Sequence, residues 1–320
     1  MFALPNTISG TKKVKKAKYF YKKGRFITNS LLFFQLKIVV RINFYLLNHI
    51  FVKIENSVLK NMEKHYKKEG RYSYFEAGEG TPMVILHGLM GGLSNFDAVA
   101  SHFSTRGYKI IIPDLPIYTQ NILKTNVKSF AKYVKDFITF KGLDRVILLG
   151  NSLGGHIALY HTKMYPEKVA GLVITGSSGL YESAMGDSYP KRGDYEYIKK
   201  KAEDVFYDPE VATKELIDEV YESVNDRIKL IKTLTIAKSA IRHNMAKDLP
   251  KMHVQTCIIW GKNDKVTPPD VAEEFNKLLP NSTLYWIDKC GHAAMMEHPD
   301  EFNRLLEDWL TNTHLAVHKA

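Results

Sequence analysis

The chain has 320 residues, enough for one large domain or two small ones, and 45% of them are hydrophobic, which is ample for a buried core. This composition excludes a disordered protein. Residues 1–61 carry twelve Lys and Arg against one acidic residue, whereas the rest of the chain holds 33 basic and 33 acidic residues, so the net charge of +11 does not indicate a nucleic-acid-binding domain.

Residues 1–61 form a basic and apolar extension that differs from the rest of the chain. Its apolar part, residues 26–54, contains Lys37 and Arg41, which interrupt a membrane span, and no cleavage site typical of a secretory signal follows it. We therefore favour translation from Met62, with a weak interfacial membrane anchor as the alternative. In either case the remainder is expected to be the functional protein.

Short apolar runs alternate with helical patterns from Met62 onward, which predicts an α/β fold with a mostly parallel, doubly wound sheet. The predicted strands are residues 83–86, 109–112, 145–149, 170–175, 256–260 and 283–287. Ligands of such sheets bind beyond the carboxyl ends of the strands.

The strand pattern stops between the fourth and fifth of these strands, and a charged, helix-periodic stretch replaces it. Helices are predicted at residues 196–205, 209–222 and 227–246. We interpret residues 181–249 as a helical cap inserted into a core that consists of residues 62–180 and 250–320.

A predicted strand, the motif Gly150-Asn-Ser152-Leu-Gly154 and a predicted helix follow one another directly. Short Gly-x-Ser-x-Gly motifs are common, but a strand before and a helix after are typical of a nucleophile elbow. In that turn the residues two positions before and after the serine must be small. Ser152 is therefore the predicted nucleophile, at the N-terminus of a helix.

A serine nucleophile requires a general base and a carboxylate that orients it. His292 follows the strand at residues 283–287, and Asp264 follows the strand at residues 256–260, in the order expected for this fold. Asp288 is too close to His292 in sequence to brace the imidazole from behind, and Asp114 precedes the nucleophile. We predict a Ser152, His292 and Asp264 triad, although turn chemistry alone could account for Asp264.

The oxyanion of acyl transfer needs two preorganised N–H donors. One is expected to be the amide of Leu153, directly after the nucleophile, and the other an amide in the glycine-rich loop of residues 87–92. Leu89 is the predicted second donor, with Met90 as the alternative.

The two cysteines, Cys257 and Cys290, have no metal-ligand spacing and are predicted to be packing residues. No metal and no organic cofactor are expected, because the predicted chemistry needs only the triad and the oxyanion donors. A reducing, cytoplasmic location is the expectation, with membrane association through residues 1–61 as the alternative.

With these residues in place, the chain from about Tyr72 to Leu310 resembles the α/β-hydrolase superfamily, in the subgroup with a helical cap. The resemblance implies a serine hydrolase without a cofactor. Within it, the Gly-Asn-Ser-x-Gly-Gly elbow, the segment Ser94-Asn95-Phe96 and the ending Cys-Gly-His292 with Glu297-His298 are similar to the meta-cleavage product hydrolases, which cleave carbon–carbon bonds.

That subgroup usually has a tryptophan after the catalytic histidine, where this chain has Ala293. A carboxylesterase-like activity on a small or medium ester is therefore our first expectation, and carbon–carbon bond hydrolysis of a ketone is the alternative. A non-catalytic ligand receptor on the same fold is a third possibility. The resemblance also indicates Asn95 and a cap arginine, Arg227 or Arg242, as substrate-binding residues.

Overall fold

A computed structural model describes residues 65–181 and 191–315, and these belong to a unit that spans Asn61–Ala320. The expected N-terminal extension lies outside the described residues. No helix among residues 65–181 and 191–315 has the length and apolar character needed to cross a bilayer.

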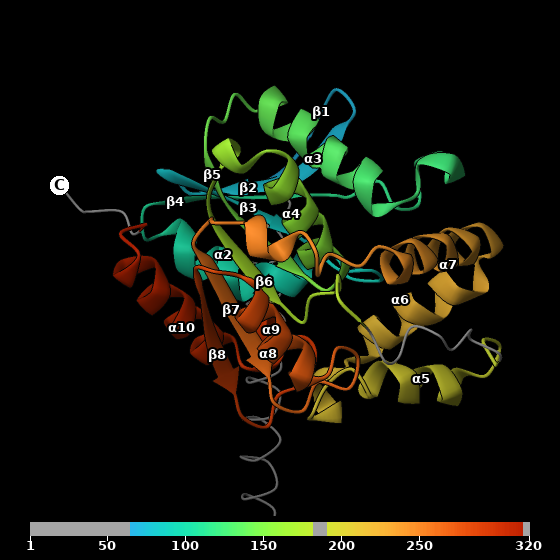
Figure 1. The fold of residues 1–320 in the computed structure, drawn as a ribbon. Coiled ribbons are helices and arrows are strands. Elements are labelled where there is room, and N and C mark those ends of the chain that lie inside the picture. Colours follow the sequence, from blue (N-terminus) through green and yellow to red (C-terminus); the bar gives the residue numbers. More distant parts are fainter. Residues whose placement is uncertain (1–64, 182–190, 316–320) are drawn as a thin grey trace, which may run out of the picture. The chain divides into compact units, whose positions relative to one another are not determined.

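The centre of this unit is an eight-stranded sheet with the strand order β1-β2-β4-β3-β5-β6-β7-β8 (Figure 1). Its strands are β1 (Tyr66–Glu69), β2 (Tyr72–Ala77), β3 (Thr81–Leu86), β4 (Tyr108–Pro113), β5 (Val146–Asn151), β6 (Val169–Thr175), β7 (Thr256–Gly261) and β8 (Ser282–Ile287). The pairs of β2 with β1 and β4 are antiparallel, and all other pairs are parallel. The predicted mostly parallel α/β fold is confirmed.

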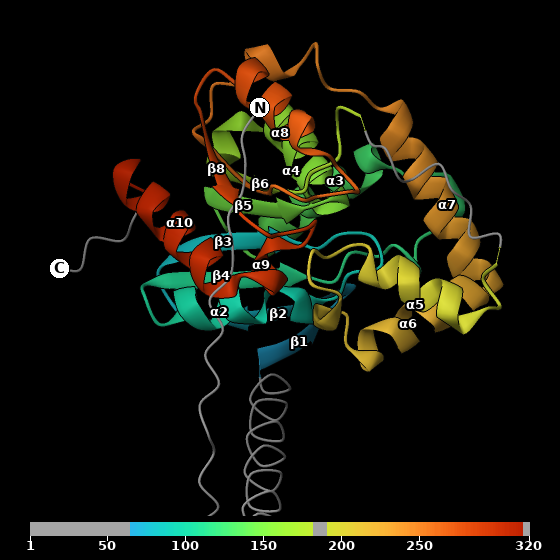
Figure 2. The same cartoon turned by 90° about the horizontal axis from the view of Figure 1, so that it is seen from below.

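Helices cover both faces of this sheet, and Figure 2 shows them as two layers with the strands between them. The helices are α2 (Asp97–Ser104), α3 (Val127–Phe140), α4 (Leu153–Met164), α5 (Tyr195–Glu203), α6 (Lys214–Asn225), α7 (Arg227–Arg242), α8 (Pro269–Leu278), α9 (Ala294–Glu297) and α10 (Pro299–Asn312). One apolar core unites the sheet with α3, α4 and α8, and a second unites it with α2, α9 and α10. Strand residues are buried on both sides, so they are apolar without alternation.

Helix α3 illustrates how the sequence specifies these elements. The side chain of Asn126 accepts a hydrogen bond from the amide of Ser129 at 2.9 Å and so caps the N-terminus. Apolar residues then recur at helical spacing and are buried on one face: Val127, Phe130, Ala131, Val134, Phe137 and Ile138.

Helices α5, α6 and α7 lie beside the sheet and its two helical layers (Figure 1), and buried residues of each join one of the two apolar cores. The side chains of Asp194, Thr213 and Asp226 cap their N-termini. Two predicted boundaries were wrong. Pro209 begins a short 3₁₀ turn, η4 (Pro209–Val211), and α6 starts only after the Thr213 cap. Helix α7 ends at Arg242 rather than residue 246, because the backbone of His243 leaves the helical region.

Candidate active site

Ser152 lies between β5 and α4, at the carboxyl edge of the sheet. Its φ of 53° and ψ of −120° are unfavourable for a residue with a side chain. Neighbouring backbone holds this conformation, since the amide of Ser152 donates to the carbonyl of Thr175 at 3.1 Å and its carbonyl accepts from the amide of Ser178 at 3.2 Å. This is the geometry of a nucleophile elbow.

The glycines around Ser152 have no room for a side chain. A Cβ at Gly150 would lie 2.4 Å from the backbone of Gly154, and a Cβ at Gly154 would lie 2.0 Å from the carbonyl oxygen of Leu86. Both contacts are with buried backbone, which cannot move aside without disturbing the sheet. The small residues on either side of Ser152 are therefore required by sterics.

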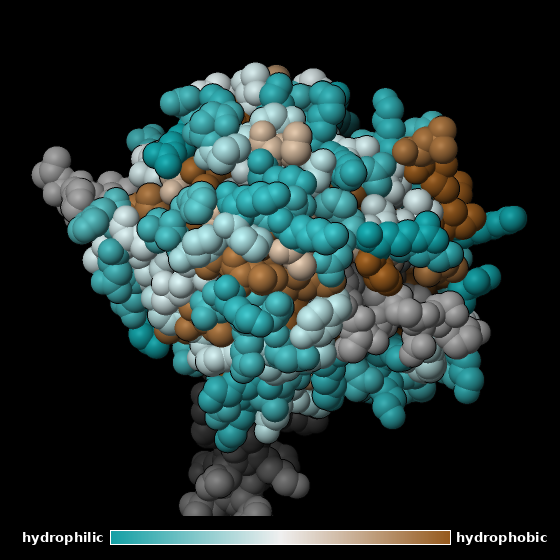
Figure 3. Space-filling model, in the orientation of Figure 1, coloured by the Kyte–Doolittle hydropathy of each residue, from teal (hydrophilic) through white to brown (hydrophobic). Residues whose placement is uncertain are grey.

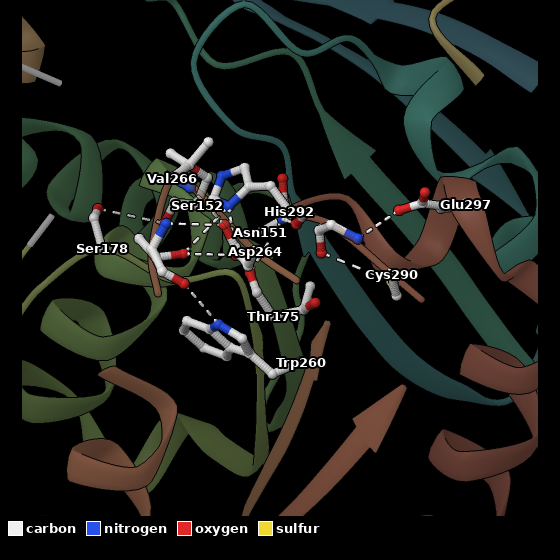
Figure 4. A network of polar contacts seen from close by, with 12 residues as sticks. Asn151, Ser152, Thr175, Ser178, Trp260, Asp264, Val266, Cys290, His292 and Glu297 are labelled. Carbon is white, nitrogen blue, oxygen red and sulfur yellow. Dashed lines mark hydrogen bonds and ion pairs between the residues drawn. The ribbon is translucent and has the colours of Figure 1, made fainter. Parts of the chain in front are cut away.

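His292 lies in the loop after β8, and its ring faces Asp264 from the loop after β7 (Figure 4). The distance between Nδ1 of His292 and Oδ2 of Asp264 is 2.8 Å, and both side chains are buried. Ser152 and His292 line the same cavity. The structure thus brings the three predicted triad residues together in one place.

Asp264 is held by its own turn as well as by the histidine. Oδ1 accepts hydrogen bonds from the amides of Val266 and Thr267 at 2.8 and 2.9 Å, and Oδ2 accepts one from the hydroxyl of Thr267 at 2.9 Å. The same carboxylate therefore stabilises its own turn and contacts His292.

The two rival carboxylates are directed elsewhere. Asp288 is exposed beside Lys262, with 3.7 Å between its Oδ1 and the ammonium. Oδ1 of Asp114 lies 4.0 Å from Nε2 of His87. Burial raises the pKa of the Asp114 carboxyl.

Two further residues hold the site and were given no role by the sequence analysis. The buried side-chain amide of Asn151 donates to the carbonyls of Thr175 at 3.1 Å and of His292 at 3.3 Å, which ties the histidine loop to the nucleophile strand. The carboxylate of Glu297 accepts from the amides of Gly291 and Asp208, both at 2.6 Å. The only signal in the sequence was their place in the motifs, Asn151 in the elbow and Glu297 in the ending after His292.

The predicted oxyanion loop is positioned by a buried histidine. Nε2 of His87 accepts from the amide of Leu115 at 3.1 Å, so Nδ1 carries the proton and donates to the carbonyl of Gly88 at 3.0 Å. Burial lowers the pKa of His87, which keeps it neutral in this role. Met90 has a φ of 57°, so the loop turns sharply at this residue.

The predicted donors differ in their relation to the cavity. Leu89 and its alternative Met90 both line it. Leu153 is buried as the first residue of α4, where the amide has no partner within the helix.

The cavity at the triad has a volume of about 410 Å³. Its wall is mainly apolar and combines the oxyanion loop, the histidine loop and α5, α6 and α7. Asn95 lines it. Arg227 and Arg242 do not: both are exposed on α7, and the cationic residues at the wall are Lys201 and Lys265. The prediction of a substrate-binding arginine at either position was wrong, because it relied on sequence position without the direction that each side chain takes from the helix.

Cys257 and Cys290 are buried, and burial raises the pKa of both thiols. They are therefore poor nucleophiles. Within residues 65–181 and 191–315, no group of three or more potential metal-ligating side chains is found.

The sequence of this chain is similar to those of known hydrolases. The family described as alpha/beta hydrolase fold matches residues 81–299. A 2-hydroxy-6-oxo-6-phenylhexa-2,4-dienoate hydrolase of Burkholderia cepacia is 26% identical over 283 residues, which cover 82% of this chain and 96% of the relative. A 2-hydroxy-6-oxononadienedioate/2-hydroxy-6-oxononatrienedioate hydrolase 1 of Pseudomonas putida is 30% identical over 261 residues, which cover 75% of this chain and 91% of the relative.

A solved structure is also similar: that of an alpha/beta hydrolase enzyme from the metagenome of sediments from the lagoon of Mar Chica, Morocco. It is 60% identical, has a TM-score of 0.66, and the match covers 78% of this chain and 99% of that chain. The family match spans the elbow, the Asp264 turn and the histidine loop. On this evidence the chain is a hydrolase and belongs to the alpha/beta hydrolase fold family.

Proposed function

We propose that this hydrolase cleaves a carbon–carbon bond in a 2-hydroxy-6-oxo-dienoate, a conjugated ketone that carries a carboxylate. The observation that carries the proposal is the similarity to two hydrolases of such substrates, each matched over at least three quarters of this chain. This favours the alternative of the sequence analysis over its first expectation, a carboxylesterase. The apolar cavity beside Ser152 supports the proposal, since it suits a substrate with an extended conjugated chain.

In this proposal Ser152 is the nucleophile or activates the water that attacks the 6-oxo carbon. His292 takes the proton as general base, and Asp264 holds its ring and stabilises the imidazolium. The amides of Leu153 and of Leu89 or Met90 stabilise the oxyanion. Helices α5, α6 and α7 act as the cap over the cavity.

The bond that breaks joins C5 to the 6-oxo carbon. The hydroxyl of water ends on C6 and produces a carboxylic acid, while C5 gains a hydrogen. For the phenyl substrate the products are benzoic acid and 2-hydroxypenta-2,4-dienoate. For this cleavage the proton of the 2-hydroxyl first moves to C5, which gives the tautomer with a 2-oxo group and a C3=C4 double bond. When the C5–C6 bond breaks, its electron pair is delocalised through C3=C4 onto the oxygen at C2, which takes up the proton from water, so no oxidant or reductant is required.

The substrate carboxylate needs a positive partner, and we assign this role to Lys201 of α5, with Lys265 as its neighbour. Both line the cavity. We choose Lys201 because it belongs to α5, whose Tyr197 and Ala202 line the cavity together with it. The ammonium of Lys265, in the loop after β7, lies 3.9 Å from a carboxylate oxygen of Asp204.

The test is turnover of 2-hydroxy-6-oxo-6-phenylhexa-2,4-dienoate, followed by loss of dienolate absorbance and by release of benzoate, beside turnover of p-nitrophenyl butyrate. We expect a higher kcat/KM for the dienoate, and loss of its cleavage in Ser152→Ala. Ser94→Ala, at an exposed serine of the 3₁₀ turn η1 (Leu93–Phe96), is the matched control and retains activity. Turnover of the ester without turnover of the dienoate would contradict the proposal and would support a carboxylesterase.

A further inference from the structure

Helix α7 presents apolar side chains on two opposite faces. Its inner face contributes Thr233, Leu234 and Ala237 to the cavity wall. Its outer face exposes Ile228 and Ile231, which are 66% and 43% accessible to solvent. A helix on the surface of a globular protein normally has polar residues on its outer face. The packing of the core does not account for these isoleucines.

A second segment contributes to the same surface. In the 3₁₀ turn η2 (Ile122–Lys124), Leu123 is 86% and Ile122 is 43% accessible to solvent. An open groove separates η2 from α7, and Ile122, Ile228 and Ile231 all line it. We refer to Ile122, Leu123, Ile228 and Ile231 as the apolar patch. Figure 3 shows hydrophobic residues gathered on the side of the molecule where α7 lies.

The projecting turn is held by hydrogen bonds. The side chain of Asn121 accepts from the amide of Leu123 at 2.9 Å and caps η2. The ammonium of Lys232 on α7 donates to the carbonyl of Tyr118 at 2.7 Å, which fixes the loop against the helix. The surrounding structure thus keeps Leu123 exposed. Exposure of this apolar side chain to water costs free energy, which would be regained if the side chain were buried against a binding partner.

The two segments that carry the patch are basic. Residues 119–128 and 227–242 contain seven basic residues and no acidic one: Lys124, Lys128, Arg227, Lys229, Lys232, Lys238 and Arg242. Two acidic residues lie nearby. The carboxylate of Asp226 accepts from the amides of Ile228 and Lys229. Burial raises the pKa of Tyr118, and Glu219 of α6 contributes to this shift. Two copies joined through this patch would bring like charges together, whereas an anionic surface would complement them.

We propose that the apolar patch and its basic surround bind the surface of an anionic lipid membrane. Exposed Leu and Ile side chains between Lys and Arg are the combination by which interfacial helices enter the boundary between headgroups and acyl chains. Because the inner face of α7 lines the cavity, this contact places the cavity wall beside the lipid. The proposal concerns a peripheral contact through described residues and does not depend on the substrate.

The experiment is co-sedimentation of the full chain with vesicles made of equal parts phosphatidylglycerol and phosphatidylcholine, beside vesicles of phosphatidylcholine alone. Wild type is expected to bind the anionic vesicles more tightly, and salt should weaken the binding. In Leu123→Ser/Ile228→Ser/Ile231→Ser we expect the lipid concentration for half-binding to rise about tenfold or more.

A charge variant, Arg227→Gln/Lys238→Gln/Arg242→Gln, leaves the apolar side chains in place and should need at least about threefold more lipid. Met164→Ser/Tyr207→Ser removes two exposed apolar side chains elsewhere and should bind as wild type does. Thermal unfolding of each variant verifies that it is folded. Residues 1–61 are common to all variants, so their contribution cancels from the comparison.

Equal lipid binding by wild type and a folded patch variant would overturn the proposal. A wild type that self-associates without binding vesicles, together with a monomeric patch variant, would overturn it too and would identify the patch as an interface between copies of this chain.

Discussion

Oδ2 of Asp264 accepts from both Nδ1 of His292 and the hydroxyl of Thr267, at 2.8 and 2.9 Å. The threonine hydroxyl also lies 3.2 Å from Nδ1 of His292, so the three groups form one buried cluster. The carboxylate that orients the imidazole is therefore itself held in place by the threonine hydroxyl. Mutation can remove the charge of the carboxylate and the hydroxyl that holds it separately.

Asp264→Asn should lower kcat by about 10³- to 10⁴-fold, because the amide cannot stabilise the imidazolium and disfavours the required tautomer. Thr267→Val leaves the carboxylate in place and removes one of its four hydrogen bonds, so its loss should stay within about tenfold. Steady-state kinetics on the dienoate measures both. An Asp264→Asn protein that is folded and fully active would mean that another group orients His292.

Lys201→Met should raise KM for the dienoate about tenfold or more, because the variant cannot pair with the substrate carboxylate. The change in kcat should be smaller. Hydrolysis of p-nitrophenyl acetate, which has no carboxylate, serves as the matched control within the same variant. Equal changes for both substrates would contradict the assigned role and indicate a general effect on the cavity.

Gly154→Ala should destabilise the protein by about 3 kcal/mol or more, since the added Cβ meets buried backbone. Its Cβ would lie 2.0 Å from the carbonyl oxygen of Leu86. Helix propensity alone predicts the opposite sign, because Ala is favoured over Gly by about 1 kcal/mol.

Gly193→Ala is the control, because its Cβ would have no atom within 4 Å. Its free energy of unfolding in urea should equal that of wild type within about 0.5 kcal/mol. A Gly154→Ala protein as stable as this control would show that the elbow relaxes more easily than its contacts suggest.

Stability should fall as the pH decreases from 7 to 5. Burial lowers the pKa of His156 to about 3, with a smaller contribution from His243, and burial lowers the pKa of His161 to about 4. In the unfolded chain both titrate near 6.5, so below that pH the unfolded state binds more protons. The stability that neutral burial allows is present above about pH 6.5 and is lost as the pH falls toward these lower values.

At pH 5 each histidine should cost up to about 2 kcal/mol relative to pH 7. Urea unfolding at the two pH values measures this difference. In His161→Gln the number of protons taken up on unfolding should be smaller by about one, so the free energy of unfolding should change less with pH. Equal free energies of unfolding at pH 5 and pH 7 would show that these histidines bind protons without unfolding.

The sequence alone determined the six strands β3 to β8 and the placement of Ser152, Asp264 and His292 in the loops after them, because these depend on local features; strands β1 and β2 were not predicted. Buried parallel strands are continuous apolar runs, and the elbow requires Gly150 and Gly154 beside the serine. Loops after such strands reach one edge of the sheet, so the order of the motifs predicts which residues meet.

Only the tertiary structure decided what lines the cavity and what supports the triad. Arg227 and Arg242 turn outward, while Lys201 and Lys265 face the cavity. Asn151 and Glu297 support the histidine loop through contacts with the backbone of distant residues. The direction of a side chain depends on how its helix is rotated against its neighbours, and backbone partners carry no sequence signature, so neither is determined by local sequence.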